Sequence, residues 1–133
     1  MRLIITHDDE IDNEQLARML PDKKLDLIIA SDLRNVRLKI KAIQNLLSNV
    51  SINFSKDLRG EHIRSCELDE RTLKFFEDTY RNHKDKNILV VGDIRLCKAL
   101  TFFLKSNAST DNSTCNSLDI FDIDKRGEVS ILP

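Results

Sequence analysis

The chain has 133 residues, of which 41% are hydrophobic, and its 21 basic and 22 acidic side chains leave a formal net charge of -1. This length and apolar content predict one domain over residues 1–133 with a core of its own. The balanced charge lacks the basic block typical of nucleic-acid surfaces, which argues against direct nucleic-acid binding. No run approaches the roughly 18 apolar residues that span a bilayer, so no membrane partner is expected.

Cysteine usage indicates a reducing, intracellular compartment, nuclear or cytoplasmic. Cys66, Cys97 and Cys115 are an odd number at wide spacings, with no CxxC pair and no apolar signal segment ahead of them. Cys97 falls within the apolar pattern of a late helix, which favours a small core residue over a reactive thiol.

The first half of the chain predicts alternating strands and helices. We expect a short buried strand at Leu3 to Thr6, a short helix at Asn13 to Leu20 and a continuous apolar strand at Leu25 to Ala30. Ser31 and Asp32 then offer oxygens that can cap a long helix. The apolar positions expected along this helix, which ends near Ser48, are Val36, Leu38, Ile40, Ile43, Leu46 and Leu47.

The second half continues the alternation. Val50 to Phe54 predicts an edge strand, and Asp69 to about Asn82 predicts a helix after an irregular polar stretch. The most apolar strand is expected at Ile88 to Val91, followed by a helix at Ile94 to Leu104. The apolar side of the helix near residue 75 is expected to carry Leu73, Phe76 and Tyr80.

The C-terminal region predicts a hairpin after a polar loop. Asn107 to Asn116 has loop composition, and strand-like runs at Leu118 to Ile123 and Glu128 to Leu132 flank the turn-forming segment Asp124 to Gly127. The whole order predicts an α/β fold of three layers, with a mostly parallel sheet, helices on both faces and a C-terminal hairpin.

Two pairs of adjacent phenylalanines raise the question of exposed aromatic surface. Phe75 and Phe76 lie on one predicted helix, and Phe102 and Phe103 on another. Adjacent helical residues are about 100° apart, so one member of each pair is expected to be partly exposed. A wide buried face that covers both members is an equal alternative.

Polar residues follow two of the predicted strands. Thr6, His7 and Asp8 end the first, and Gly92 and Asp93 end the most apolar one. The carboxyl ends of parallel strands meet at one sheet edge, where α/β proteins gather their reactive groups. These residues are therefore expected to lie close together.

Several segments, in order along the chain, resemble motifs of the histidine phosphatase, or phosphoglycerate mutase-like, superfamily. Thr6-His7-Asp8 stands where that family has Arg-His-Gly, and the segment from Leu27 to Leu33 with the helix after it resembles S-x-L-x-R-A-x-x-T-A. Leu58-Arg59-Gly60-Glu61 resembles an L-x-E region, and Val90-Val91-Gly92-Asp93 with Ala99-Leu100 lines up without gaps on V-V-S-H-G-G-V-I-R-A-L-L. A late N-x-S-I-x-x-L-D strand resembles the residues from Asn116 to Asp122.

The resemblance implies a degenerate catalytic site. In such enzymes one histidine attacks phosphorus, a second histidine and two arginines hold the phosphate oxygens, and an acid protonates the leaving oxygen. His7 keeps the position of the nucleophile and Glu61 that of the acid. The three positions that usually hold cations carry Thr6, Asn35 and Asp93. Losing one preorganised donor typically costs about 10²–10³ in rate, so no catalysis is expected.

The rim of the expected site carries negative charge. Five acidic side chains are expected near His7, namely Asp8, Asp9, Glu10, Asp32 and Asp93. Negative charges repel a phosphate, so the net charge of the pocket is expected to have changed from positive to negative. Arg34 or Arg59 offers an alternative that would restore phosphate binding, although Arg34 and Arg37 are interpreted as solvated helix residues.

Two further site interpretations stand beside this one. His7, Asp8, Asp93 and Glu61 could supply metal ligands, but no close-spaced ligand pair supports a metal, and neither a metal nor a cofactor is predicted. His62 and His83 have polar neighbours in sequence and are interpreted as surface residues. His7 itself is expected to be a remnant that hydrogen-bonds Asp93.

The expected function is that of a catalytically inactive, histidine-phosphatase-like domain serving as a protein-interaction subunit of a larger complex. Its expected partner is a larger protein subunit in a hetero-oligomer. The chain is similar in size and expected fold to the histidine-phosphatase-like subunit of the RNA polymerase III general transcription factor, which implies a transcription assembly. The alternative is a divergent, active phosphatase or mutase that uses His7 as phospho-acceptor.

Overall fold

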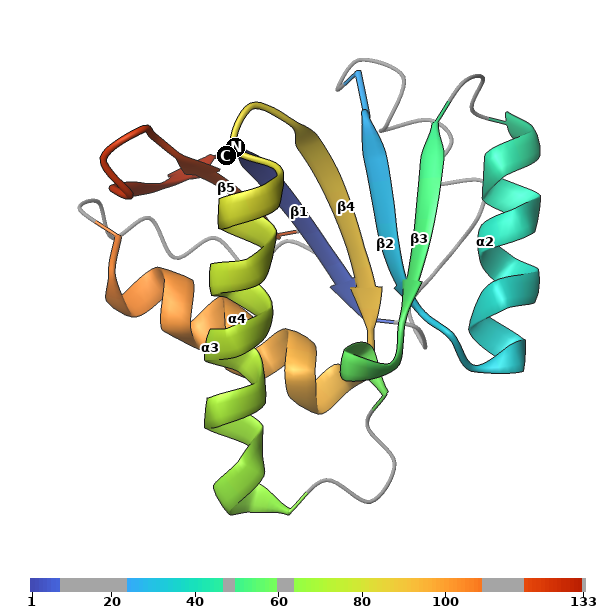
Figure 1. Ribbon diagram of the computed structural model, residues 1–133, viewed down its shortest axis with the longest axis horizontal. Coiled ribbons are helices and arrows are strands. Elements are labelled where there is room, and N and C mark those ends of the chain that lie inside the picture. The colour runs from blue at the N-terminus through green and yellow to red at the C-terminus, as the bar shows by residue number, and fades with distance from the viewer. Residues whose placement is uncertain (8–23, 47–49, 60–63, 109–118, 133) are drawn as a thin grey trace.

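One mixed sheet, with strand order β3-β2-β4-β1-β5-β6, organises the computed structural model, which describes residues 1–7, 24–46, 50–59, 64–108 and 119–132 (Figure 1). The described elements are β1 (Arg2–His7), β2 (Leu27–Ser31), α2 (Arg34–Leu46), β3 (Ser51–Ser55), the 3-10 helix η3 (Lys56–Leu58), α3 (Ser65–Asn82), β4 (Asn87–Gly92), α4 (Ile94–Ser106), β5 (Asp119–Ile123) and β6 (Val129–Leu132).

The parallel part of the sheet comprises β3, β2, β4 and β1, which pair with one another in that order. β5 runs antiparallel to β1, and β6 runs antiparallel to β5, so the C-terminal hairpin extends the sheet on the β1 side. Gly127 lies in the hairpin turn with φ of +81°, a conformation that glycine adopts without strain. The predicted fold class is confirmed.

Two apolar cores lie on opposite faces of the sheet. Strand residues alternate between them, as in β1, where Leu3 and Ile5 join one core and Ile4 joins the other. The first core packs against α3 and α4, and the second packs against α2 (Figure 1). Both faces of the parallel strands are therefore covered, which explains their nearly continuous apolar sequences.

The four parallel strands end at a common edge, marked by His7, Ser31, Ser55 and Gly92 (Figure 1). η3 follows β3 at this edge, and the carbonyl of Leu58 accepts a hydrogen bond from the amide of Asp93 at 3.2 Å. A Cβ at Gly92 would lie 3.3 Å from the Cβ of Leu58, so glycine allows this close approach.

Most element predictions are confirmed, with shifted boundaries. α3 begins at Ser65, four residues before the predicted start, and a short η3 lies within the stretch predicted to be irregular. The helix predicted at Asn13 to Leu20 lies outside the described residues. The predicted loop at Asn107 to Asn116 lies mostly outside them as well.

Two predicted apolar positions are wrong. Leu38 on α2 is 61% exposed and Leu73 on α3 is 43% exposed. The buried stripe of α3 instead contains Thr72, Phe75 and Thr79. Helical periodicity alone could not fix the centre of the stripe, because Leu73, Phe76 and Tyr80 also recur at helical spacing.

The phenylalanine pairs differ in how strongly their members are exposed. Phe102 is 75% exposed, whereas Phe103 is half-buried and meets Phe76 edge to face at a centroid distance of 5.4 Å. Phe75 is buried and Phe76 packs against the same core. The expectation of one partly exposed member therefore holds for both pairs, since Phe76 on α3 is only partly buried and Phe102 on α4 is largely exposed.

The two cysteines that the structure describes have contrasting environments. Cys97 is buried in the core, as predicted, and its thiol lies 3.5 Å from the carbonyl of Thr6. Cys66 is exposed on α3. Within the described ranges, no helix has both the length and the apolar character required to cross a membrane.

Candidate functional site

His7 ends β1 at the carboxyl edge of the sheet, at the position predicted for a phospho-acceptor. The register pairs His7 with Gly92 of β4, so Asp93 follows directly on the neighbouring strand. The side chain of His7 is half-buried and its Nδ1 atom is enclosed. Thr6 is only 4% exposed. The structure therefore brings the His7 and Asp93 segments together, as predicted.

Asp93 is the N-cap residue of α4. Its Oδ1 accepts a hydrogen bond from the amide of Arg95 at 2.9 Å, and the Nε of Arg95 lies 3.6 Å from the same oxygen. A carboxylate suits this place because it satisfies an otherwise unpaired amide and interacts favourably with the positive end of the helix dipole. Asp93 thus has a defined structural role, and it directly follows Gly92, the residue that pairs with His7 in the sheet.

Asp32 and Arg59 form an ion pair at the same edge. Two guanidinium nitrogens of Arg59, Nε and Nη2, donate to the two carboxylate oxygens of Asp32, with a distance of 2.6 Å for the Nη2 contact. The hydrogen bond from Arg59 holds the pKa of Asp32 below its ordinary value of 3.8. The Arg59 side chain, one of the two alternative phosphate ligands that the sequence offers, is therefore engaged by a carboxylate.

The first turn of α2 carries Asn35, which stands where the superfamily motif has an arginine, and the two arginines that flank it. Arg34, Asn35 and Arg37 are all exposed. The Nε of Arg37 donates to the backbone carbonyl of Asp32 at 2.7 Å, and its guanidinium lies 5.1 Å from the ring centroid of Phe54. The prediction that Arg37 is a solvated residue covering apolar surface is confirmed.

Several predicted site residues lie outside the described residues, namely Asp8, Asp9, Glu10, Glu61 and His62. Within the described part of the chain, no group of three or more His, Cys, Asp or Glu residues could hold a metal ion. The metal alternative gains no support from the residues that can be placed, His7 and Asp93.

His83 differs from its interpretation as an ordinary surface residue. It follows α3, is half-buried with an enclosed Nδ1 atom, and lines a cavity of about 170 Å³ between α3 and β3. Burial lowers its pKa from the ordinary 6.5, and the positive charge of Lys86 adds to the effect. The sequence does carry a signal for this position, because Phe75, Thr79 and His83 recur at the spacing of helical turns.

Comparison with known proteins gives matches only at the level of structure. No protein-family model matches the chain, and no curated protein matches it. The phosphoglycerate mutase of Plasmodium falciparum superposes with a TM-score of 0.68 at 15% identity, covering 99% of this chain and 88% of that one. YhfR of Bacillus stearothermophilus gives a TM-score of 0.73 at 12% identity, with coverage of 98% and 94%.

The protein histidine phosphatase SixA, in a complex with tungstate, gives a TM-score of 0.65 at 11% identity and covers 100% of this chain and 95% of the other. The chain has the phosphoglycerate mutase-like fold. The resemblance that the sequence motifs suggested is therefore confirmed for the architecture. Within the phosphoglycerate mutase-like fold, His7, Asp93 and the Asp32–Arg59 pair lie at the carboxyl edge of the parallel strands.

Proposed function

We propose that this chain is a catalytically inactive, histidine-phosphatase-like domain that serves as a protein-interaction subunit of a larger complex. The observation that carries the proposal is the environment of His7. The neighbouring strand end supplies Asp93, a helix-capping carboxylate, where the superfamily motif has a histidine. A phosphoryl group in transfer develops negative charge on its oxygens and requires fixed cations around it, so this carboxylate opposes the reaction.

The environment of Arg59, one of the two arginines that could replace a lost cation, supports the same proposal. Arg59 reaches the edge, but its guanidinium makes two hydrogen bonds to Asp32. Binding phosphate would require Arg59 to exchange this carboxylate for the phosphate, so the net gain in binding free energy would be small.

Phosphate release and oxyanion binding test the loss of catalysis. We expect the purified chain to hydrolyse p-nitrophenyl phosphate no faster than its His7→Ala variant, and orthovanadate to leave its thermal unfolding unchanged. Phosphate release that disappears in His7→Ala, or stabilisation by orthovanadate that requires His7, would overturn the inactive assignment.

Affinity purification tests the interaction role. We expect the tagged chain, isolated from its own cells at physiological salt, to bring with it one larger protein in stoichiometric amount. The finer proposal, which rests on similarity of fold and size, is that this protein belongs to the RNA polymerase III general transcription factor and that the complex is nuclear. Mass spectrometry distinguishes that assembly from any other, and recovery of the chain alone contradicts the interaction role.

The second candidate is an active, divergent phosphatase with His7 as phospho-acceptor. It is favoured by one observation, the position of His7 at the end of β1 on the edge where this fold gathers polar groups. A phosphohistidine detected at His7 by mass spectrometry after incubation with a phosphate monoester would support it.

A further inference from the structure

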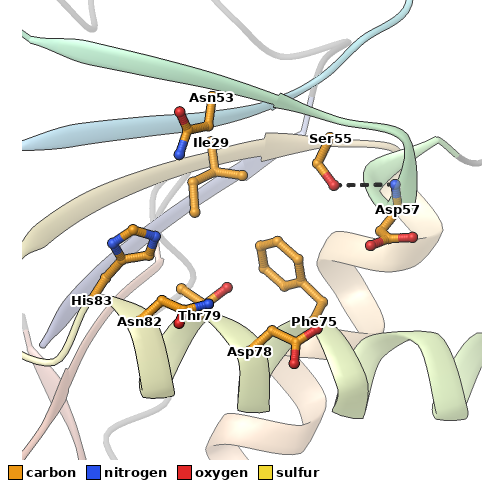
Figure 2. Close-up of a pocket in the computed structure, with 9 residues that line it drawn as sticks. All are labelled: Ile29, Asn53, Ser55, Asp57, Phe75, Asp78, Thr79, Asn82 and His83. Atoms are coloured by element: carbon orange, nitrogen blue, oxygen red, sulfur yellow. Dashed lines mark hydrogen bonds between the residues drawn. The ribbon is translucent and has the colours of Figure 1, made fainter.

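The cavity between α3 and β3 lies beside the end of the strand order, where β3 is the outermost of the described strands. Figure 2 shows Asn53 and Ile29 on the strand side of the cavity and Phe75 on the α3 side, with the His83 ring at one end and Asp57 at the other. The residues that line the cavity are Ile29, Asn53, Ser55, Asp57, Phe75, Asp78, Thr79, Asn82 and His83. It lies on the face of the sheet covered by α3, away from α2.

The lining combines an apolar floor with acidic groups. Ile29 and Phe75 are buried core residues, whereas Asp57 and Asp78 are half-buried and carry carboxylates. No lysine or arginine is among the described residues that line the cavity. Two carboxylates outweigh one imidazole whether or not His83 is protonated, so the net charge of the lining is negative. An anion is disfavoured there, and a cation on an apolar stem is complementary.

The volume of the cavity limits the size of the ligand that it can hold. Pockets for whole metabolites typically enclose about 300–1,000 Å³. The cavity volume of about 170 Å³ is smaller than this range. It suits one long side chain better than a nucleotide or a sugar phosphate.

β3 provides a template for an extended backbone next to the cavity. Among the described strands, β3 pairs with β2 alone, so no described strand pairs with its other side. Its sequence from Ser51 to Ser55 contains no charged residue and no proline, the features that usually protect an edge strand. Asn53 and Ser55 face the cavity from alternate positions of β3.

We propose that an extended segment of a partner protein adds to the β3 edge and inserts an arginine or lysine side chain into this cavity. The backbone of the segment pairs with β3. The aliphatic part of the inserted arginine or lysine packs on Phe75 and Ile29, and its cationic group interacts with Asp57 and Asp78. Strand addition supplies affinity through main-chain hydrogen bonds and specificity through side-chain pockets. The inference rests on the proposed interaction role and specifies the surface and the partner chemistry for it.

Selection from a display library of random short peptides tests the proposal with the intact chain as bait. We expect the peptides recovered on the wild type to share one basic residue flanked by β-formers. Binding of the best peptide should fall about tenfold in the double variant Asp57→Asn/Asp78→Asn, as for loss of partly exposed charge pairs. Recovery of no peptide, or of peptides without a shared basic residue, overturns the proposal.

A matched control separates the cavity from general charge effects. The double variant Asp69→Asn/Glu77→Gln removes the same charge from exposed positions of α3 outside the cavity lining and should bind like the wild type. All variants are compared only where their thermal unfolding matches that of the wild type. An equal loss in the control and in the cavity variant contradicts a specific cavity site.

The backbone part of the proposal has its own test. Methylation of alternate backbone amides of the selected peptide should abolish binding in one register and preserve it in the other, since alternate amides of an added strand face β3. Tolerance in both registers, or equally tight binding of free arginine amide, excludes strand addition. The Asp57→Asn/Asp78→Asn variant can also be purified from cells. If it still recovers the same complex in the same amount, this inference is overturned, whereas the proposed interaction role is unaffected.

Discussion

Asp32 and Arg59, two residues of the candidate site, form an ion pair with each other. The Asp32 side chain is 15% exposed and the Arg59 side chain is 46% exposed, so solvent screens the interaction. In a double-mutant cycle with Asp32→Asn and Arg59→Gln, we expect a coupling free energy below about 1 kcal/mol at neutral pH. A coupling several times larger would contradict the screened geometry.

The same pair gives an acid dependence whose sign follows from the lowered pKa of Asp32. Below the unfolded value of 3.8, the unfolded chain binds a proton that the folded chain still excludes. The stabilisation is therefore complete above this pH and disappears as the pH falls through the folded pKa. The coupling free energy from the cycle should show this loss when urea unfolding is repeated at decreasing pH.

His83 predicts a pH dependence in a higher range. Burial lowers its folded pKa from 6.5, so between the two values the unfolded chain binds more protons than the folded one. The free energy of unfolding should therefore decrease as the pH falls below about 6.5. The decrease should be smaller in His83→Gln, measured by urea unfolding, and an identical profile in both proteins would show that His83 contributes nothing.

Residue identities in the candidate site were only partly predictable from sequence. The expected absence of the superfamily's cations depends only on which residues stand at Thr6, Asn35 and Asp93, and it remains a prediction from the motif alignment. The pairing of Arg59 with Asp32 could not be predicted, since the two are 27 positions apart and meet only when β2 and η3 reach the same edge. Side-chain direction at such an edge depends on tertiary contacts that motif spacing does not encode.

At the scale of elements, the contact between β4 and η3 depends on Gly92. An added Cβ would lie 3.3 Å from Cβ of Leu58, so Gly92→Ala should lower the free energy of unfolding by about 1 kcal/mol through overpacking. The loss should be smaller in a Leu58→Gly background, because glycine lacks the Cβ that would make the closest contact. Urea unfolding of the four proteins measures this difference, and simple additivity would contradict the contact.

Gly127 provides a comparison with a different cause. Nothing lies within 4 Å of the position that a Cβ would take there, but its φ is +81°. Gly127→Ala should therefore destabilise through backbone strain alone, and Gly127→Asn should be milder, because asparagine tolerates this conformation better.

Element existence was more predictable than helix orientation. The buried strands β1, β2 and β4 are recognisable as short apolar runs, because both of their faces are covered. The rotation of α3 was not recognisable, since Thr72 and Thr79 occupy its buried stripe while Leu73 is exposed. A threonine can be buried when its hydroxyl bonds locally, as that of Thr72 does to the carbonyl of Leu68 at 2.8 Å.

At the scale of the whole molecule, the sheet connects the two cores into one unit. The single tyrosine of the chain, Tyr80, links α3 to the hairpin turn, because its hydroxyl lies 3.0 Å from the carbonyl of Asp124 and 3.2 Å from that of Lys125. We expect tyrosine fluorescence and far-ultraviolet circular dichroism to report the same urea midpoint. A fluorescence transition at lower urea would show that the hairpin separates before the parallel sheet unfolds.

The alkylation rate of the buried Cys97 thiol reports how often α4 opens locally. In a Cys115→Ser background, an alkylating reagent should modify the exposed Cys66 at the rate of an accessible thiol, whereas Cys97 should react only after α4 moves away from the carbonyl of Thr6. The delay between the two modifications, followed by mass spectrometry, therefore measures how often the backbone beside His7 becomes accessible. A bound partner that slows the modification of Cys97 without changing that of Cys66 would show that binding stabilises this edge of the sheet against opening.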